Sequence, residues 1–149
     1  MNYTLDTTAL IKGSLPPRRT KKDAIFEEQA RLFKIASGII DEIFQGKHTL
    51  SIPNVALVEV AAVVSRLTGD DAAAKKTTDF VRGLATMINE ESSCSEAISL
   101  AIMTKASGFD NVFIACAKIT ASMLITDDKK MFEAAKRAGI KARLLRDMK

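Results

Sequence analysis

The chain has 149 residues, of which 47% are hydrophobic and 27% are charged. This length and composition allow the chain to bury a core of its own, so we expect one domain over residues 1–149 rather than a disordered, collagen-like or coiled-coil protein. The 22 Lys and Arg against 18 Asp and Glu give a net charge of +4, which permits contact with nucleic acid without requiring it.

Several classes of site are excluded by residues that the sequence lacks. One histidine and two cysteines cannot complete a zinc site within one chain, and no dinucleotide-binding or P-loop glycine motif is present. The longest apolar stretch, residues 55–64, is about half as long as a bilayer-spanning helix, and the first residues lack the order of a secretory signal. We therefore expect a cytoplasmic protein without a membrane span, whose chemistry depends on carboxylates.

The first quarter of the chain predicts one strand, one helical turn and a loop. Residues 2–6 favour a strand that ends on Asp6, and residues 7–12 favour a helical turn that Gly13 stops. The stretch 14–22 combines two prolines with four basic residues, which is typical of an exposed loop.

The rest of the chain alternates between helical and extended patterns. Apolar residues recur every three or four positions from the N-cap Asp23 to Gly46, which predicts a long amphipathic helix. The next expected elements are a strand over 48–52, a helix from Pro53 to Gly69, a helix capped by Asp70 or Asp71 and ending near Leu84, and a short strand over 85–88. After them we expect a helix with the capping box Ser93 to Glu96 that ends at Gly108, and a helix that Asp110 opens. The last elements are a strand over 122–126, a helix capped by Asp127 or Asp128, and a strand over 140–145.

Strands that alternate with helices indicate an α/β fold. Parallel neighbours need a long return connection, so we expect a mostly parallel central sheet of about five strands with helices on both faces. Asp6 and the Asp127–Asp128 pair then follow strands at the carboxyl edge, where open α/β sheets bind ligands. Each of these residues, and Asp110 as well, could also be a helix N-cap without any function.

Glu59 is the acid that ordinary helix structure explains least. It lies in the apolar run 55–64, so we expect its helix to be buried on most sides. An unpaired, buried carboxylate costs several kcal/mol, and Arg66 lies about 10 Å further along the helix, too far to pair directly. Glu59 therefore needs another cationic partner, an exposed cleft or a metal ion.

Four acidic segments follow one another in a characteristic order: Leu5-Asp6-Thr7-Thr8, Val58-Glu59-Val60, Phe109-Asp110-Asn111 and Thr126-Asp127-Asp128. Over nearly the whole chain, their order and spacing resemble the PIN-domain nuclease family, and in particular the small VapC-type ribonuclease toxins. The resemblance implies that the catalytic acids and metal ligands are Asp6, Glu59, Asp110 and Asp128, supported by Thr8 and Thr126. Asp127 ranks second as the fourth acid, and a helix cap is the preferred interpretation of it.

The resemblance also implies a reaction and a set of partners. Converging carboxylates repel one another, so we expect Mg²⁺ or Mn²⁺ as the cofactor of an endoribonuclease. A toxin of this type would have RNA as its substrate, a cognate antitoxin as its protein partner and a homodimeric state. The candidate RNA contacts are the basic residues Arg18, Arg19, Lys21, Lys22, Lys129 and Lys130.

Other functions remain open at this stage. The main alternatives are a non-catalytic PIN-fold module that binds RNA or a protein, and an RNA-processing nuclease that is not a toxin. A haloacid-dehalogenase-like phosphatase is a weaker alternative, because that pattern requires an aspartate where Thr8 stands. A signalling receiver domain lacks both its acidic pair and its middle phosphoacceptor in this sequence.

Overall fold

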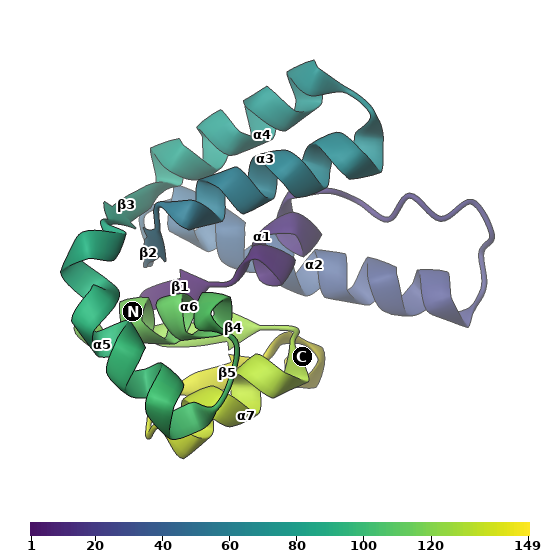
Figure 1. Ribbon diagram of the computed structural model, residues 1–149. Helices are drawn as coiled ribbons and strands as arrows, with labels where there is room; N and C mark the ends of the chain where they lie inside the picture. The colour runs from purple at the N-terminus through teal and green to yellow at the C-terminus, as the bar shows by residue number, and fades with distance from the viewer.

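Five parallel strands form the central sheet of the computed structural model, which describes residues 1–149 (Figure 1). The strands lie in the order β3-β2-β1-β4-β5, and every neighbouring pair is parallel. The predicted α/β class, with a parallel sheet of about five strands, is confirmed. The strands are β1 (Asn2–Leu5), β2 (Thr49–Pro53), β3 (Ala85–Ile88), β4 (Met123–Thr126) and β5 (Ala142–Leu144).

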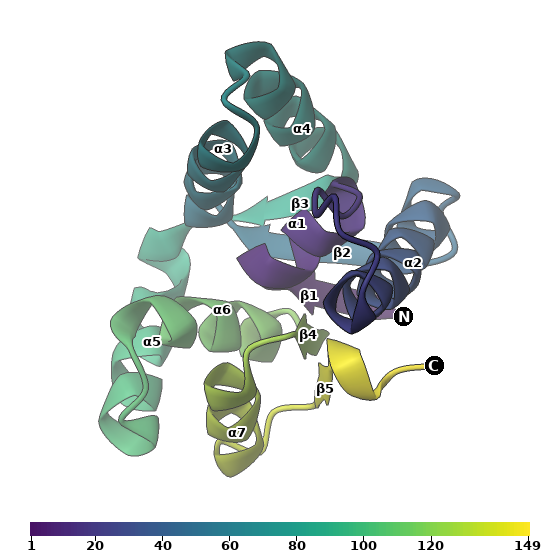
Figure 2. The same cartoon turned by 90° about the vertical axis from the view of Figure 1, so that its right-hand side faces the viewer.

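Seven helices connect and cover the strands. In Figure 2 the strands run from β3 to β5 down the middle of the molecule, with α2 on one side and α5 and α6 on the other. The helices are α1 (Thr7–Ser14), α2 (Ala24–Phe44), α3 (Val55–Thr68), α4 (Asp71–Leu84), α5 (Glu90–Thr104), α6 (Gly108–Ile119) and α7 (Lys129–Arg137), and a 3₁₀ turn, η1 (Leu145–Asp147), follows β5.

The strand register places the ends of β1 and β4 side by side. Leu5 is the partner of Ile125, so the residues that follow them leave the sheet at the same edge. Both strands are apolar and fully buried at these positions, because helices cover both faces of a parallel sheet. Helix α6 contributes Phe113 and Ile114 to the core and precedes β4 in the chain. Because α6 runs opposite to β4, its first turn lies at the edge where β4 ends.

Gly13 has a different role from the predicted helix stop. It lies inside α1, which continues to Ser14. A Cβ atom at Gly13 would stand 2.9 Å from the carbonyl oxygen of Ala36, so glycine is what allows α1 to pack closely against α2. The loop predicted over 14–22 is confirmed from residue 15 onwards, where no helix or strand is present, but Ser14 still belongs to α1.

Three predicted helix starts are wrong, and one of them is Asp110, since α6 begins at Gly108. Pro53 ends β2 instead of opening α3, and its backbone is used in the pairing with Ile88 of β3. Helix α5 starts earlier than the capping box indicates, because Asn89 caps it by accepting a hydrogen bond from the amide of Glu91 at 2.9 Å. Ser93 therefore lies within α5, which also ends at Thr104 rather than Gly108.

Helix α3 is less buried than its apolar sequence suggests. It packs against α4, which lies beside it in Figures 1 and 2, and against α1. Its outer side stays open, where Val58 is 67% exposed and Leu67 is 50% exposed. The expectation that this helix is buried on most sides is therefore wrong. No helix in the structure is both long and apolar enough to span a bilayer.

Candidate functional site

Asp6 occupies the carboxyl end of the central strand β1 and is only 1% exposed. It is the N-cap of α1, since its carboxylate accepts a hydrogen bond from the amide of Ala9 at 2.8 Å. The hydroxyl of Thr8 lies 2.8 and 2.9 Å from the two carboxylate oxygens, and the hydroxyl of Thr126 donates to one of them. The cap prediction for Asp6 is confirmed, yet capping uses only part of this carboxylate.

The environment of Asp6 opposes its negative charge. Burial raises its pKa from 3.8 to about 6, although hydrogen bonds from Thr126, Ala9 and Thr8 act in the opposite direction. The charge of Asp128 raises the pKa further. A carboxylate with a raised pKa and no cationic partner, at the edge of a parallel sheet, is a candidate for a functional group.

Two threonine hydroxyls connect Asp6 to the turn between β4 and α7. Thr8 accepts a hydrogen bond from the amide of Asp127 at 3.3 Å, and Thr126 accepts one from the amide of Asp128 at 2.9 Å. Each hydroxyl also donates to Asp6. The two hydroxyls therefore join the carboxylate of Asp6 to the backbone amides of Asp127 and Asp128, which fixes the turn relative to Asp6.

Asp110 lies in the first turn of α6 but does not cap the helix. The N-cap is Ser107, whose hydroxyl accepts a hydrogen bond from the amide of Asp110 at 3.1 Å. Asp110 is therefore not the N-cap of α6, and its carboxylate stands in the first turn beside the cap residue Ser107. Burial raises the pKa of Asp110 and the charge of Asp128 adds to this effect, while a hydrogen bond with Ser107 and the charge of Lys130 act in the opposite direction.

Asp128, and not Asp127, caps the helix that follows β4. Asp128 is the N-cap of α7, since it accepts hydrogen bonds from the amides of Lys130 at 2.7 Å and Met131 at 3.2 Å. Its charge nevertheless reaches both Asp6 and Asp110. The preferred interpretation of Asp127 as the helix cap is wrong, because its side chain turns away from α7.

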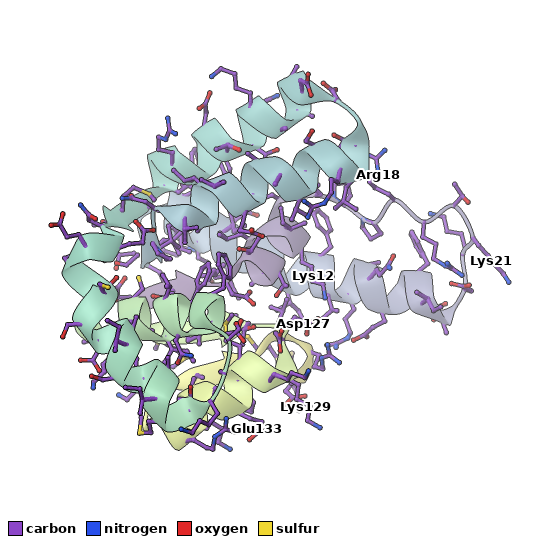
Figure 3. The ribbon with its side chains drawn as sticks, in the orientation of Figure 1. Lys12, Arg18, Lys21, Asp127, Lys129 and Glu133 are labelled. Atoms are coloured by element: carbon purple, nitrogen blue, oxygen red, sulfur yellow. The ribbon has the colours of Figure 1, made fainter.

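Asp127 is instead neutralised by two cations. It is 6% exposed and forms ion pairs with Lys12 of α1 and with Arg146 of η1, the latter at 3.0 Å. Figure 3 shows Lys12 and Asp127 next to each other near the middle of the molecule. Burial acts to raise the pKa of Asp127, but the hydrogen bonds from Arg146 and Lys12 outweigh it and hold this pKa below its ordinary value.

Glu59 stands apart from the three acids at this edge. It is half-buried in the second turn of α3 and forms no ion pair or hydrogen bond with another side chain. Burial is the largest cause of the raised pKa of Asp6 and of Asp110, and Asp128 is the acid whose charge adds to both. The charge of Asp128 thus reaches both Asp6 and Asp110, whereas no hydrogen bond or ion pair joins Glu59 to these acids.

The donor chemistry of the three acids suits a hard divalent cation, although the side chains do not form a preformed cage. No three carboxylate, imidazole or thiolate groups converge closely enough to hold a metal ion in this side-chain arrangement. However, none of Asp6, Asp110 and Asp128 forms an ion pair with Lys or Arg, whereas the adjacent Asp127 has two. Oxygen donors whose charges remain uncompensated are the groups that Mg²⁺ and Mn²⁺ prefer.

A cleft beside Asp110 carries basic residues that the sequence did not single out. It is lined by Lys105, Ala106, Ser107, Asp110, Lys129, Lys130, Glu133 and Arg137. Lys129 and Lys130 were candidate RNA contacts, but Lys105 and Arg137 come from the ends of two helices, and no local sequence signal relates them. Only the packing of α5, α6 and α7 brings these cations to the same cleft.

The basic loop of residues 16–22 lies elsewhere. Figure 3 shows Arg18 and Lys21 on a segment that extends away from the sheet and from α7. Arg19 forms an ion pair with Asp23, and the ammonium group of Lys22 lies 3.5 Å from the centre of the Phe26 ring. Part of the positive charge of this loop is therefore already engaged within the chain.

Comparisons with known proteins agree with this architecture. A family model described as PIN domain matches residues 3–137. No curated protein matches the chain.

Three solved structures extend the similarity to the arrangement of elements. The chain has a TM-score of 0.65 and 14% identity to VapBC2 from Rickettsia felis bound to a DNA fragment from its promoter, with 97% of this chain and 98% of the other covered. FitAcB from Neisseria gonorrhoeae has a TM-score of 0.62 and 14% identity, with 98% of this chain and 99% of the other covered. PAE2754 from Pyrobaculum aerophilum has a TM-score of 0.60 and 17% identity, with 95% of this chain and 83% of the other covered. At these identities the similarity concerns the fold alone.

Proposed function

Since the chain belongs to the PIN domain family, we propose that it is a divalent-metal-dependent endoribonuclease that hydrolyses RNA phosphodiester bonds. One observation carries this proposal: Asp6, Asp110 and Asp128 come from three separate segments to one edge of the sheet and lack cationic partners. Without a ligand this arrangement is unfavourable, because burial and mutual repulsion raise the pKa of Asp6 and of Asp110. A divalent cation would relieve the repulsion.

Each side chain has a distinct part in the proposed reaction. Asp6 and Asp110 would be the principal ligands of Mg²⁺ or Mn²⁺, and Asp128 and Glu59 would hold a second ion or orient water. The bound cation would supply Lewis-acid stabilisation of the phosphate and activation of a water molecule. Thr8 and Thr126 hold the two oxygens of Asp6 in place, so this carboxylate is oriented before any ligand arrives.

The biological role that we propose is that of a toxin paired with an antitoxin. Support comes from the fold shared with VapBC2, and with FitAB, whose structure was determined bound to a DNA fragment. The antitoxin would cover the carboxyl edge of the sheet and could place an Arg or Lys among the unpaired carboxylates. A homodimer and a cytoplasmic location complete this proposal.

The test is cleavage of single-stranded RNA by the purified chain. We expect cleavage with Mg²⁺ or Mn²⁺, and loss of cleavage in EDTA. Asp110→Asn should abolish cleavage because a ligand charge is lost, whereas the exposed Asp71→Asn in α4 is a matched control that should retain it. Folded, metal-supplemented protein that binds RNA but never cleaves it would instead support the non-catalytic alternative.

Toxin and RNA-processing roles differ in their consequence for the cell. Expression of the wild-type chain should arrest growth, and expression of Asp110→Asn should not. Growth that continues while RNA cleavage is demonstrated in vitro would support an RNA-processing nuclease.

A further inference from the structure

The cleft between α5, α6 and α7 concentrates positive charge next to Asp110. Lys105 follows the C-terminus of α5, Lys129 and Lys130 form the start of α7, and Arg137 ends α7. Arg137 is oriented by a hydrogen bond to the carbonyl oxygen of Thr104 at 3.0 Å. Two helices, α5 and α7, therefore present cations to a single cleft, to which α6 contributes the proposed site acid Asp110.

These cations are only partly balanced within the chain, where the charge of Lys130 lowers the pKa of Asp110. Lys105, Lys129 and Lys130 are exposed and take part in none of the seven ion pairs of the structure. Glu133 also lines the cleft, yet it forms no ion pair. The first turn of α7 contains no acidic residue, and lysines there are unfavourable near the positive end of the helix dipole. The cleft lining has four basic against two acidic residues, so it keeps an excess of positive charge that can bind an anion.

The basic loop has fewer free cations, since Arg18 and Lys21 form no ion pair but the other two basic residues are engaged. The charge of Arg19 is engaged by Asp23, and Lys22 lies against Phe26. The groove beside the loop is lined by four hydrophobic residues and by Lys12, Arg18 and Arg19, but it contains none of the proposed site acids. An RNA backbone that must bring a phosphate to Asp110 therefore has a shorter and more complete cationic path through the cleft.

We propose that the cleft lined by Lys105, Lys129, Lys130 and Arg137 is the track that holds the RNA backbone leading to Asp110, and that the loop of residues 16–22 contributes little. This inference rests on the proposed ribonuclease function. Lys129 and Arg137 are eight residues apart on α7, which corresponds to about 12 Å along the helix. The track therefore accommodates a stretch of backbone rather than a single phosphate.

Binding of a single-stranded RNA oligonucleotide, measured in EDTA so that no cleavage occurs, tests the track. Lys105→Gln combined with Lys130→Gln should weaken binding at least 10-fold and reduce the salt dependence of log K by about 1.4, or roughly 0.7 for each lost phosphate contact. The same loss of charge in the loop, Arg18→Gln with Lys21→Gln, should weaken binding less than threefold. Lys47→Gln with Lys76→Gln, exposed lysines on other elements, is the matched charge control.

The outcomes separate this inference from the proposed function. Equal losses from the cleft and loop pairs, a larger loss from the loop pair, or no RNA binding by the wild-type chain would overturn the track. If the cleft pair binds RNA like the wild type while the wild type still cleaves RNA with Mn²⁺, the track is wrong and the nuclease stands. If the cleft pair loses binding but the wild type never cleaves, the track stands and the nuclease fails.

Kinetics give a second readout if the nuclease is active. The cleft pair should raise KM for RNA by about the factor by which it weakens binding, with kcat changed less than threefold, because the track makes contacts that are equal in ground and transition states. A fall in kcat with an unchanged KM would show that these lysines act on the reacting phosphate and would overturn their role as a track.

Discussion

The hydroxyl of Thr126 donates a hydrogen bond to the carboxylate of Asp6, although 120 residues separate them in the chain. The contact exists because β1 and β4 are parallel neighbours and therefore end at the same edge of the sheet. Thr126 also accepts a hydrogen bond from the amide of Asp128 at 2.9 Å. One buried hydroxyl thus sets the position of one proposed ligand and connects it to the turn that carries another.

Thr126→Val should raise the pKa of Asp6 further, because the hydroxyl currently lowers it. The valine has nearly the same shape, but it leaves the amide of Asp128 without its partner, so we expect a loss of about 1–3 kcal/mol in the free energy of unfolding. The pH profile of metal-dependent cleavage should move to higher pH. Thr126→Ser keeps the hydroxyl and should retain the wild-type profile; a profile shifted equally by both variants would contradict this role.

Asp6→Asn should stabilise the metal-free protein at neutral pH. The pKa of Asp6 is about 6 in the fold and is near 3.9 in an unfolded chain, so ionisation is less favourable in the folded state. Protonated Asp6 makes its full contribution to the free energy of unfolding below about pH 4, and this contribution is lost as the pH rises through 6. At pH 7.5 the variant should exceed the wild type by up to about 3 kcal/mol.

Denaturant unfolding in EDTA at pH 4.5 and pH 7.5 measures this difference. The gain from Asp6→Asn should be much larger at the higher pH, where the wild-type carboxylate is ionised. Saturating Mn²⁺ should reverse the order, because it stabilises only a protein that binds it. A variant that loses more stability at pH 7.5 than at pH 4.5 would show that capping of α1 dominates at Asp6.

The sequence was sufficient to predict where the strands end and which acids follow them. Asp6 and the Asp127–Asp128 pair come directly after apolar strand segments, and parallel strands bring such positions to one edge. Asp110 also reaches this edge, because α6 precedes β4 and runs opposite to it. These features depend on local patterns and on strand order, which alternating elements constrain strongly.

The division of roles between Asp127 and Asp128 could not be predicted in the same way. Adjacent residues in a turn differ only in side-chain direction, and here that direction is decided by Lys12, 115 residues earlier, and Arg146, 19 residues later. The start of α5 was missed for a different reason. Asn89 and Ser93 are both good N-caps by sequence, and only the packing of the helix selects Asn89.

Asp127→Ala should destabilise the protein more than Asp128→Ala. Removal of Asp127 leaves Lys12 and Arg146 without their buried acceptor, and breaking such a pair costs about 3–5 kcal/mol when it is fully buried. Both cations are partly exposed, so we expect about 2 kcal/mol here, against about 1 kcal/mol for the lost cap.

Urea unfolding at pH 7 measures both variants, and acid provides a control on the mechanism. The pKa of Asp127 is lowered in the fold, so its contribution is present at neutral pH and is lost as pH falls through that lowered pKa. The difference in free energy of unfolding between the wild type and Asp127→Ala should therefore become smaller in strong acid. A larger loss of free energy of unfolding for Asp128→Ala than for Asp127→Ala at pH 7 would contradict this prediction and show that Asp128 contributes more to stability.

Asp128→Asn should separate the two functions of Asp128, because asparagine is as good an N-cap as aspartate but carries no charge. Helix α7 should keep its cap, so the free energy of unfolding in EDTA should change by less than about 0.5 kcal/mol. Loss of the charge that raises the pKa of Asp6 and Asp110 should lower both values in the metal-free protein. Calorimetry should show weaker Mn²⁺ binding, because one ligand charge is missing.

The comparison with Asp127→Asn completes this test. Asp127 is already neutralised by Lys12 and Arg146, so its replacement should reduce stability and leave Mn²⁺ affinity within about threefold of the wild type once folding is taken into account. Opposite effects of the two substitutions on stability and on metal affinity would place Asp128, and not its neighbour, among the ligands. If Asp127→Asn weakens Mn²⁺ binding more than Asp128→Asn does, the fourth acid is Asp127, and the ion pairs with Lys12 and Arg146 must open when the metal binds.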